Sequence, residues 1–147
     1  MKILLSLLFF LFIGENTFSQ NPKEDSLIKQ IDKLSGTKKI DTQLALGEYL
    51  HKNKSEQAKA YAAEALKMSI SSKYDKGIAQ AYDLLSVIAL QESKFQESIE
   101  YSLKTLEISE RNKDFSMSAQ VYVSIANAYL NLSNFKLAVS NYKKAVN

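Results

Sequence analysis

The sequence predicts an all-α protein: a solenoid of about three helical hairpins preceded by one short helix. Apolar residues make up 46% and charged residues 24% of the 147 residues, which is a globular composition. Only four Gly and one Pro occur, too few turn residues for an all-β sandwich or barrel. From about residue 40 onward, apolar residues recur at helical spacing in segments separated by short polar stretches.

The first twenty residues have the layout of a secretory signal peptide. Lys2 supplies a positive charge, Ile3–Ile13 is apolar, and the small residues Thr17 and Ser19 precede Gln20. The apolar run is shorter than the roughly 20 residues that a membrane-spanning helix needs. We therefore expect a secreted or periplasmic protein, cleaved near Ser19–Gln20. An uncleaved signal anchor is the alternative, and it would attach the chain to a membrane.

A short amphipathic helix is predicted over residues 22–35. Asn21 is suited to the N-cap and Pro22 to the first helical position, and Gly36 is expected to end the helix. The apolar residues of this segment follow helical spacing: Leu27, Ile28, Ile31 and Leu34.

The rest of the chain repeats itself. A shift of 40 residues superposes 78–107 on 118–147, and seven of these thirty positions are identical. Such a period is typical of solenoids, in which stacked units bury a continuous core. The identical pairs are Ala79/Ala119, Gln80/Gln120, Tyr82/Tyr122, Leu90/Leu130, Ser93/Ser133, Phe95/Phe135 and Lys104/Lys144. The predicted organisation is a signal peptide, a leading helix region and three repeat units: 1–20, 21–37, 38–77, 78–117 and 118–147.

The third unit carries a family resemblance. Its pattern is Tyr122, Ile125-Ala126, Tyr129, then Ala138, Tyr142 and Ala145. This pattern resembles the tetratricopeptide repeat (TPR). The resemblance implies a right-handed α-solenoid of helix-turn-helix hairpins that binds a protein or peptide and has no catalytic site. The 40-residue period exceeds the usual 34, and the Pro that normally follows the second helix is missing, so armadillo or HEAT repeats of similar length are the alternative.

Side-chain size explains the repeated positions. Small residues in the first helix of each unit are expected to face small residues in the second, so that the two helices approach closely. Large aromatic residues are expected to fill the space between neighbouring hairpins. The small pairs are Gly47/Ala58, Ser86/Ser98 and Ala126/Ala138, and the large residues are Tyr82, Tyr122, Tyr129 and Phe135.

The residue inventory argues against catalysis and cofactors. Without cysteine the chain has no disulfide, thiolate zinc site or lipid-bearing cysteine. His51 is the single histidine, so a paired-histidine metal site is excluded. No Gly-x-Ser-x-Gly elbow or Gly-rich phosphate loop occurs. The formal charge is +3 with both signs mixed along the chain, so no basic patch for nucleic acid stands out.

The resemblance also implies where a partner would bind. In the tetratricopeptide family, groove contacts come from the second, fifth, ninth and twelfth positions of each unit's first helix. In this chain these positions are Asp41, Leu44, Glu48 and His51, then Gln80, Asp83, Val87 and Leu90, then Gln120, Val123, Asn127 and Leu130. Leu44 and Glu48 stand where clamps for a C-terminal carboxylate carry Lys and Asn, so we expect a helix or an extended peptide instead.

The last helix is expected to leave Val139, Tyr142 and Val146 uncovered. Either the native chain continues, or this open face pairs with another molecule, for example in self-association that Tyr142→Glu would disrupt. The layout also resembles the sensory region of bacterial TPR-containing histidine kinases and helix-turn-helix regulators. The alternative function is therefore the extracytoplasmic input region of a longer signal-transduction protein.

Overall fold

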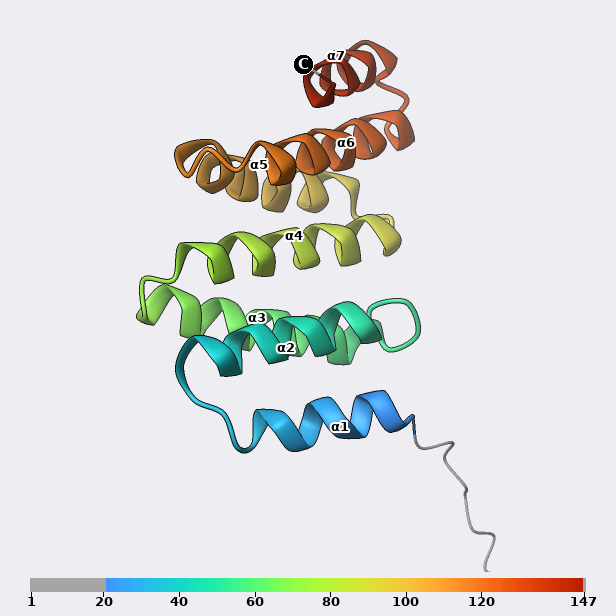
Figure 1. Cartoon of the computed structure of the whole chain (residues 1–147). Helices are drawn as coiled ribbons and strands as arrows, with labels where there is room; N and C mark the ends of the chain where they lie inside the picture. The colour runs from blue at the N-terminus through green and yellow to red at the C-terminus, as the bar shows by residue number, and fades with distance from the viewer. Residues whose placement is uncertain (1–20, 147) are drawn as a thin grey trace, which may run out of the picture.

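The computed structural model describes residues 21–146, which form seven α-helices stacked in chain order (Figure 1). The predicted signal peptide, residues 1–20, lies outside the described residues. The helices are α1 (Pro22–Ile31), α2 (Gly36–Leu50), α3 (Ser55–Ser71), α4 (Asp75–Gln91), α5 (Phe95–Arg111), α6 (Phe115–Asn131) and α7 (Phe135–Ala145). The all-α prediction is confirmed, and no helix in this part of the chain is long and apolar enough to cross a membrane.

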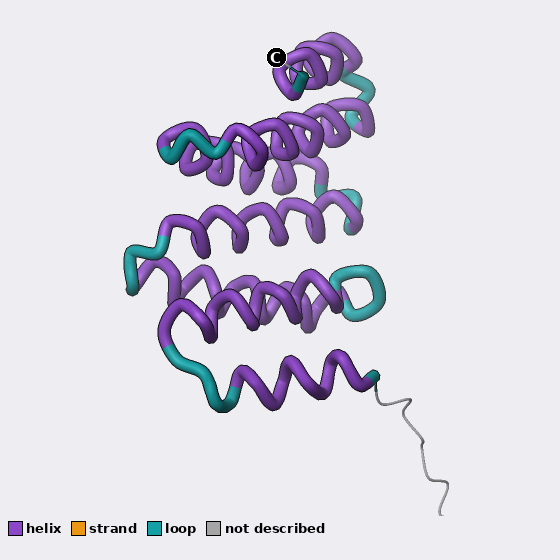
Figure 2. Tube along the Cα trace, viewed as in Figure 1, coloured by secondary structure: helices purple, strands orange, loops and turns teal. Residues whose placement is uncertain are grey.

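Consecutive helices pack as antiparallel neighbours, and the turns alternate between the two sides of the stack (Figure 2). Beyond these sequential contacts, α2 contacts α4, and α4 contacts α6. The first helices of the three hairpins therefore lie side by side and form one continuous surface.

Four of the turns share one backbone conformation. In each, a single non-glycine residue takes a left-handed φ between 53° and 60°. The amide N–H of the next residue then donates to the carbonyl five residues earlier, as Lys94 does to Ala89 at 2.8 Å, which is the C-terminal capping bond of a Schellman motif. Because these turns use Lys and Ser, none of the four needs a glycine. The left-handed residues are Lys73, Ser93, Lys113 and Ser133.

The small residues bring paired helices together as predicted. A Cβ added at Gly47 would lie 3.4 Å from the carbonyl oxygen of Ala58. In the second hairpin, the Ser86 hydroxyl donates to the carbonyl of Ser98 at 3.0 Å. Ala126 and Ala138 are both buried.

The aromatic prediction is correct for Tyr82, Tyr122 and Tyr129, which pack partly buried against the two core clusters. It is wrong for Phe135, whose side chain is 63% exposed. Phe135 is the first residue of α7, so its side chain lies at the turn and not between two hairpins.

The predicted end of the leading helix also needs correction. The leading helix ends at Ile31 and not at residue 35, and Gly36, with φ +59°, stands at the start of α2 instead of closing the first helix. The first helices of the second and third hairpins begin at Asp75 and Phe115, about three residues before the predicted unit starts at 78 and 118.

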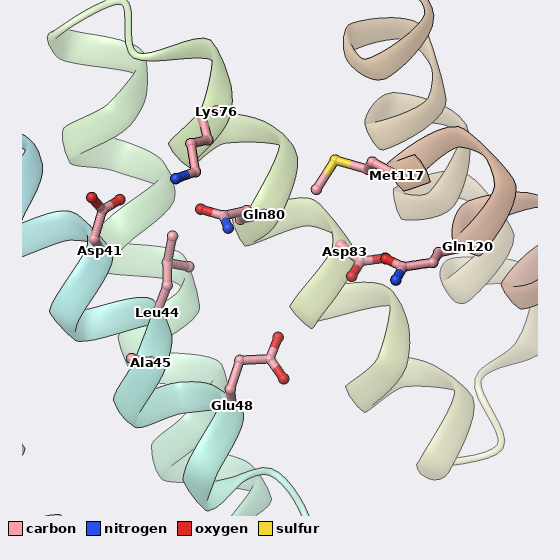
Figure 3. Close-up of a pocket in the computed structure, with 9 residues that line it drawn as sticks. All are labelled: Asp41, Leu44, Ala45, Glu48, Lys76, Gln80, Asp83, Met117 and Gln120. Carbon is pink, nitrogen blue, oxygen red and sulfur yellow. The ribbon is translucent and has the colours of Figure 1, made fainter. Parts of the chain in front are cut away.

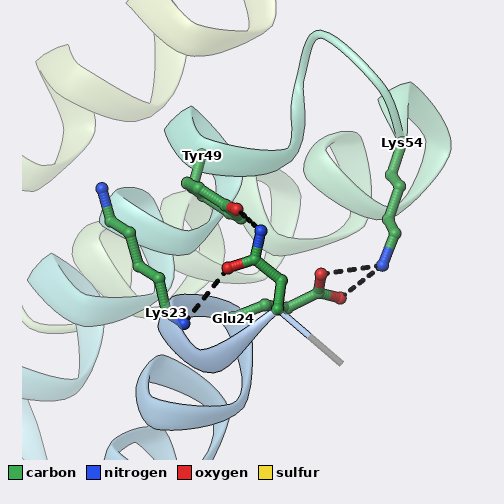
Figure 4. Close-up of polar contacts among 5 residues, drawn as sticks. Lys23, Glu24, Tyr49 and Lys54 are labelled. Carbon is green, nitrogen blue, oxygen red and sulfur yellow. Dashed lines mark hydrogen bonds and ion pairs between the residues drawn. The ribbon is translucent and has the colours of Figure 1, made fainter. Parts of the chain in front are cut away.

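Helix α1 packs on the first hairpin through Leu27 and Ile31, which join the hydrophobic core, and through polar contacts (Figure 4). The Lys54 ammonium lies 2.6 Å from a Glu24 carboxylate oxygen. The Lys23 ammonium lies 5.0 Å from the centre of the Tyr49 ring, and the side-chain amide of Asn21 donates to the Tyr49 hydroxyl. Asn21 is also the N-cap of α1, since its side chain accepts from the amide of Lys23, and Pro22 follows it as predicted.

At the other end of the stack, one face of α7 is open. Val139, Tyr142 and Val146 are 53%, 36% and 84% exposed, as the sequence predicted. Forty residues earlier, Ile99, Ser102 and Leu106 are buried, because α5 is packed between α4 and α6.

Candidate binding groove

The first helices of the three hairpins enclose a cavity of about 350 Å³, which we call the inner groove (Figure 3). Residues from α2, α4 and α6 line it together, although they are up to 79 positions apart in the chain. Apolar, amide and charged side chains all contribute. The lining residues are Asp41, Leu44, Ala45, Glu48, Lys76, Gln80, Asp83, Met117 and Gln120.

Three carboxylates dominate the charge of the inner groove. Burial, and to a smaller extent the neighbouring Glu48 carboxylate, raises the pKa of Asp83 to about 6. Asp41 accepts a hydrogen bond from the Tyr74 hydroxyl at 3.0 Å. Among the ion pairs within residues 21–146, none includes these three carboxylates or Lys76. The acidity of the groove is therefore not neutralised by a salt bridge within the described chain.

Six of the positions predicted from the family resemblance line this cavity. They come from all three helices, and Figure 3 shows Asp83 of α4 and Gln120 of α6 directed toward each other, with Glu48 facing the space between α2 and α4. The six residues are Asp41, Leu44, Glu48, Gln80, Asp83 and Gln120.

The other predicted groove residues lie outside the cavity. His51 follows the last residue of α2, where its Nδ1 lies 3.2 Å from Oε1 of Gln91. Val87 is half-buried, while Val123 and Leu130 are 40% and 46% exposed. The side-chain oxygen of Asn127 accepts a hydrogen bond from the Tyr142 hydroxyl, so this amide holds α6 against α7.

The cavity is also lined by three residues that are not among the predicted groove positions: Ala45, Lys76 and Met117. Lys76 stands four residues before Gln80, and Met117 three before Gln120, so both lie on the same helical stripe. Each stands about one helical turn before the first predicted groove residue of its helix. Extending the stripe one turn toward the N-terminus would have included both residues.

Within residues 21–146, no group of three or more His, Asp or Glu side chains is placed to hold a metal ion.

Comparisons with known proteins place this geometry in a class. Residues 119–147 match the family model of the tetratricopeptide repeat. The TPR domain of Arabidopsis FLU superposes with a TM-score of 0.67 at 25% identity, over 85% of this chain and 95% of that chain. The N-terminal domain of stress-induced protein-1 (STI-1) from C. elegans gives a TM-score of 0.58 at 20% identity, over 86% of each chain. No curated protein sequence matches significantly.

The described chain thus has the fold of a tetratricopeptide-repeat domain, and residues 119–147 match that repeat in sequence. Domains of this class bind protein partners and are typically non-catalytic. The finer assignment of a groove and its ligand rests on the side chains described above.

Proposed function

We propose that this protein is a non-catalytic scaffold that binds a segment of a partner protein in the inner groove, and that this segment carries a basic side chain. The observation that carries the proposal is the set of three carboxylates in a cavity shared by α2, α4 and α6, none of which forms a salt bridge within residues 21–146.

The electrostatics favour a Lys or Arg in this position. A carboxylate that is partly removed from water is destabilised in its charged form unless an opposite charge approaches. The pKa of Asp83, raised to about 6, reflects such a site. Leu44 and Met117 offer apolar contact beside the carboxylates, so the segment would place an apolar residue next to its basic one.

The test is selection from a randomised peptide library on the purified chain, followed by affinity measurements on the enriched peptides. We expect these peptides to carry Lys or Arg. The double variant Glu48→Gln/Asp83→Asn should weaken their binding by about tenfold or more, the scale expected from losing a partly buried charge contact.

The matched control is Glu107→Gln, which removes an exposed carboxylate from α5. It should leave the affinity unchanged. Enriched peptides without basic residues, or equal affinity for the double variant and the wild type, would show that the inner groove is not the binding site.

We also propose that the protein is exported. The support is the sequence layout of residues 1–20: a positive start, an apolar run and small residues before Gln20. N-terminal sequencing of the protein recovered from the source cell's extracytoplasmic fraction should show a start at Gln20 or Asn21. A chain that retains Met1 would contradict cleavage.

A further inference from the structure

A second cavity lies between α3 and α5, over the side of α4 that faces away from the inner groove. We call it the outer cavity. Its volume is about 530 Å³, within the range of roughly 300–1,000 Å³ typical of small-molecule sites. Leu85, on its floor, stands nine residues after Lys76 of the inner groove, which places the two side chains on opposite faces of α4.

Two tyrosines give the outer cavity an aromatic wall. The rings of Tyr82 and Tyr101 stack with centroids 6.1 Å apart and planes at 27°. The Lys104 ammonium lies 5.0 Å from the first ring centre and 5.7 Å from the second, in cation–π contact with both. Leu66 and Ile70 of α3 complete an apolar surface opposite them, and Ile70 is 55% exposed.

The charge at the outer cavity is positive. Lys59, Lys67 and Lys104 line it, and no carboxylate does. Lys59 lies 3.7 Å from Glu92. Lys67 and Lys104 form no ion pair within the described part of the chain, so both ammonium groups are available to an anion.

The next repeat shows that packing alone does not require a lining of lysines and apolar side chains without a carboxylate. Forty residues on, the tyrosine and the lysine above it recur, with the Lys144 ammonium 5.2 Å from the Tyr122 ring centre. The cavity there includes a carboxylate, Glu110, which accepts a hydrogen bond from Tyr122 at 2.7 Å. Among the lining positions that change are Lys67 to Glu107, Ile70 to Glu110 and Tyr101 to Asn141, together with Lys59 to Ile99 and Ser71 to Arg111.

The pair of a tyrosine and a lysine above its ring thus recurs with the repeat. The cationic and apolar lining, by contrast, is a feature of this one cavity. We propose that the outer cavity binds a small organic anion with an aromatic or aliphatic body. Its carboxylate, sulfonate or phosphate would lie between Lys67 and Lys104, and its apolar part would contact Ile70, Leu66 and the tyrosine rings. This site is independent of the inner groove and of the function proposed for it.

The probe for this proposal is 8-anilinonaphthalene-1-sulfonate, an aromatic anion, titrated by calorimetry and by methyl NMR of the purified chain. We expect the methyl signals of Ile70, Leu66 and Leu85 to shift. The variant Lys67→Glu/Ile70→Glu, which introduces the two acidic side chains of the next repeat, should reduce affinity by about tenfold or more. Both substituted positions are exposed, so its melting temperature should stay close to that of the wild type.

The control is Val139→Glu/Lys143→Glu, which makes the same chemical change on the exposed face of α7 and should leave the affinity unchanged. Asp83→Asn should also leave it unchanged, which separates this site from the inner groove. The uncharged analogue N-phenyl-1-naphthylamine should bind about tenfold more weakly.

Equal binding of the charged and uncharged probes, unchanged affinity of the Lys67→Glu/Ile70→Glu variant, or methyl shifts confined to α7 would each overturn the proposal. So would a cavity that ignores the small anion but binds an acidic amphipathic peptide, because the ligand would then be a protein.

Discussion

At the scale of single residues, the Asp83 carboxyl couples stability to pH. Its pKa rises from 3.8 to about 6 on folding, chiefly because the group is buried and also because Glu48 is near. The folded state therefore holds the proton more tightly than the unfolded state. The resulting stabilisation is present below about pH 4 and is lost as the pH rises through about 6.

Asp83→Asn is expected to raise the free energy of unfolding at pH 7 by about 1–3 kcal/mol, since each pKa unit corresponds to about 1.4 kcal/mol. Below pH 4 the difference should fall to a few tenths, because the wild-type side chain is then protonated in both states. Urea denaturation followed by circular dichroism, at pH 7 and below pH 4, measures the difference in unfolding free energy between the variant and the wild type. A stabilisation that is equal at both would contradict the raised pKa as its cause.

Gly47 is a second residue whose replacement has a defined cost. A Cβ at this position would lie 2.6 Å from Cδ2 of Leu84, and Leu84 is fully buried, so it has little room to move. The overpacking should cost about 1–3 kcal/mol, against about 1 kcal/mol of improved helix propensity. We expect Gly47→Ala to lower the free energy of unfolding by about 1 kcal/mol.

The matched test adds Leu84→Ala, which removes the atom in conflict. In the background of Leu84→Ala, the Gly47→Ala change should become neutral or stabilising. The double-mutant cycle of unfolding free energies should then show that the effects of the two substitutions are not additive. If Gly47→Ala stabilises the wild type by about the propensity difference alone, the close approach of α2 and α4 at this point is not limiting.

At the scale of elements, the second hairpin differs from the first in the chemistry between its helices. The Ser86 hydroxyl lies 2.7 Å from the Ser102 hydroxyl and 3.1 Å from that of Ser98, and all three residues are buried. The equivalent places in the first hairpin hold Gly47, Ala58 and Ala62. The same close packing of α4 and α5 is thus achieved with a small polar network.

This network predicts a non-additive response. Ser86→Ala alone should cost about 1–2 kcal/mol, because it leaves buried hydroxyls without their partner. The triple variant Ser86→Ala/Ser98→Ala/Ser102→Ala removes every partner together and should cost clearly less than three times as much. Chemical denaturation of the single and triple variants gives the comparison, and strictly additive costs would show that the hydroxyls act independently.

Much of this element organisation follows from the sequence, because the 40-residue period repeats both the apolar stripe and the small residues between paired helices. The helix starts were harder to locate. The first turns of α4 and α6 carry few buried apolar side chains, and Lys76 and Phe115 there are both exposed, so these turns do not show the apolar pattern. Lys76 was missed as a groove residue for this reason.

Neither the raised pKa of Asp83 nor the outer cavity could be predicted from the sequence, and the reason is different. Both depend on side chains that meet only through packing: Glu48 of α2 with Asp83 of α4, and Lys67 of α3 with Lys104 of α5. Periodicity assigns each residue to a face of its own helix. It does not give the distance between faces of different helices.

At the scale of the whole molecule, stability is expected to vary along the stack. Each repeat contacts mainly its neighbours, so the array behaves as a nearly one-dimensional system in which the ends open more easily than the middle. The burial of side chains follows this order. Eight residues of α4 are buried, whereas α1 and α7 each bury one, Ile31 and Ala138.

Amide hydrogen exchange should therefore be slowest in α4 and α5, where exchange requires opening of the whole array. It should be fastest in α1 and α7, which can separate from the stack alone. Because α1 is fastened by the Lys54–Glu24 ion pair and the Asn21–Tyr49 hydrogen bond, Lys54→Ala should speed exchange in α1 and leave α5 unchanged. Exchange that slows or quickens equally in all seven helices would mean that the array opens as a single cooperative unit, and that its neighbour contacts are stronger than their burial indicates.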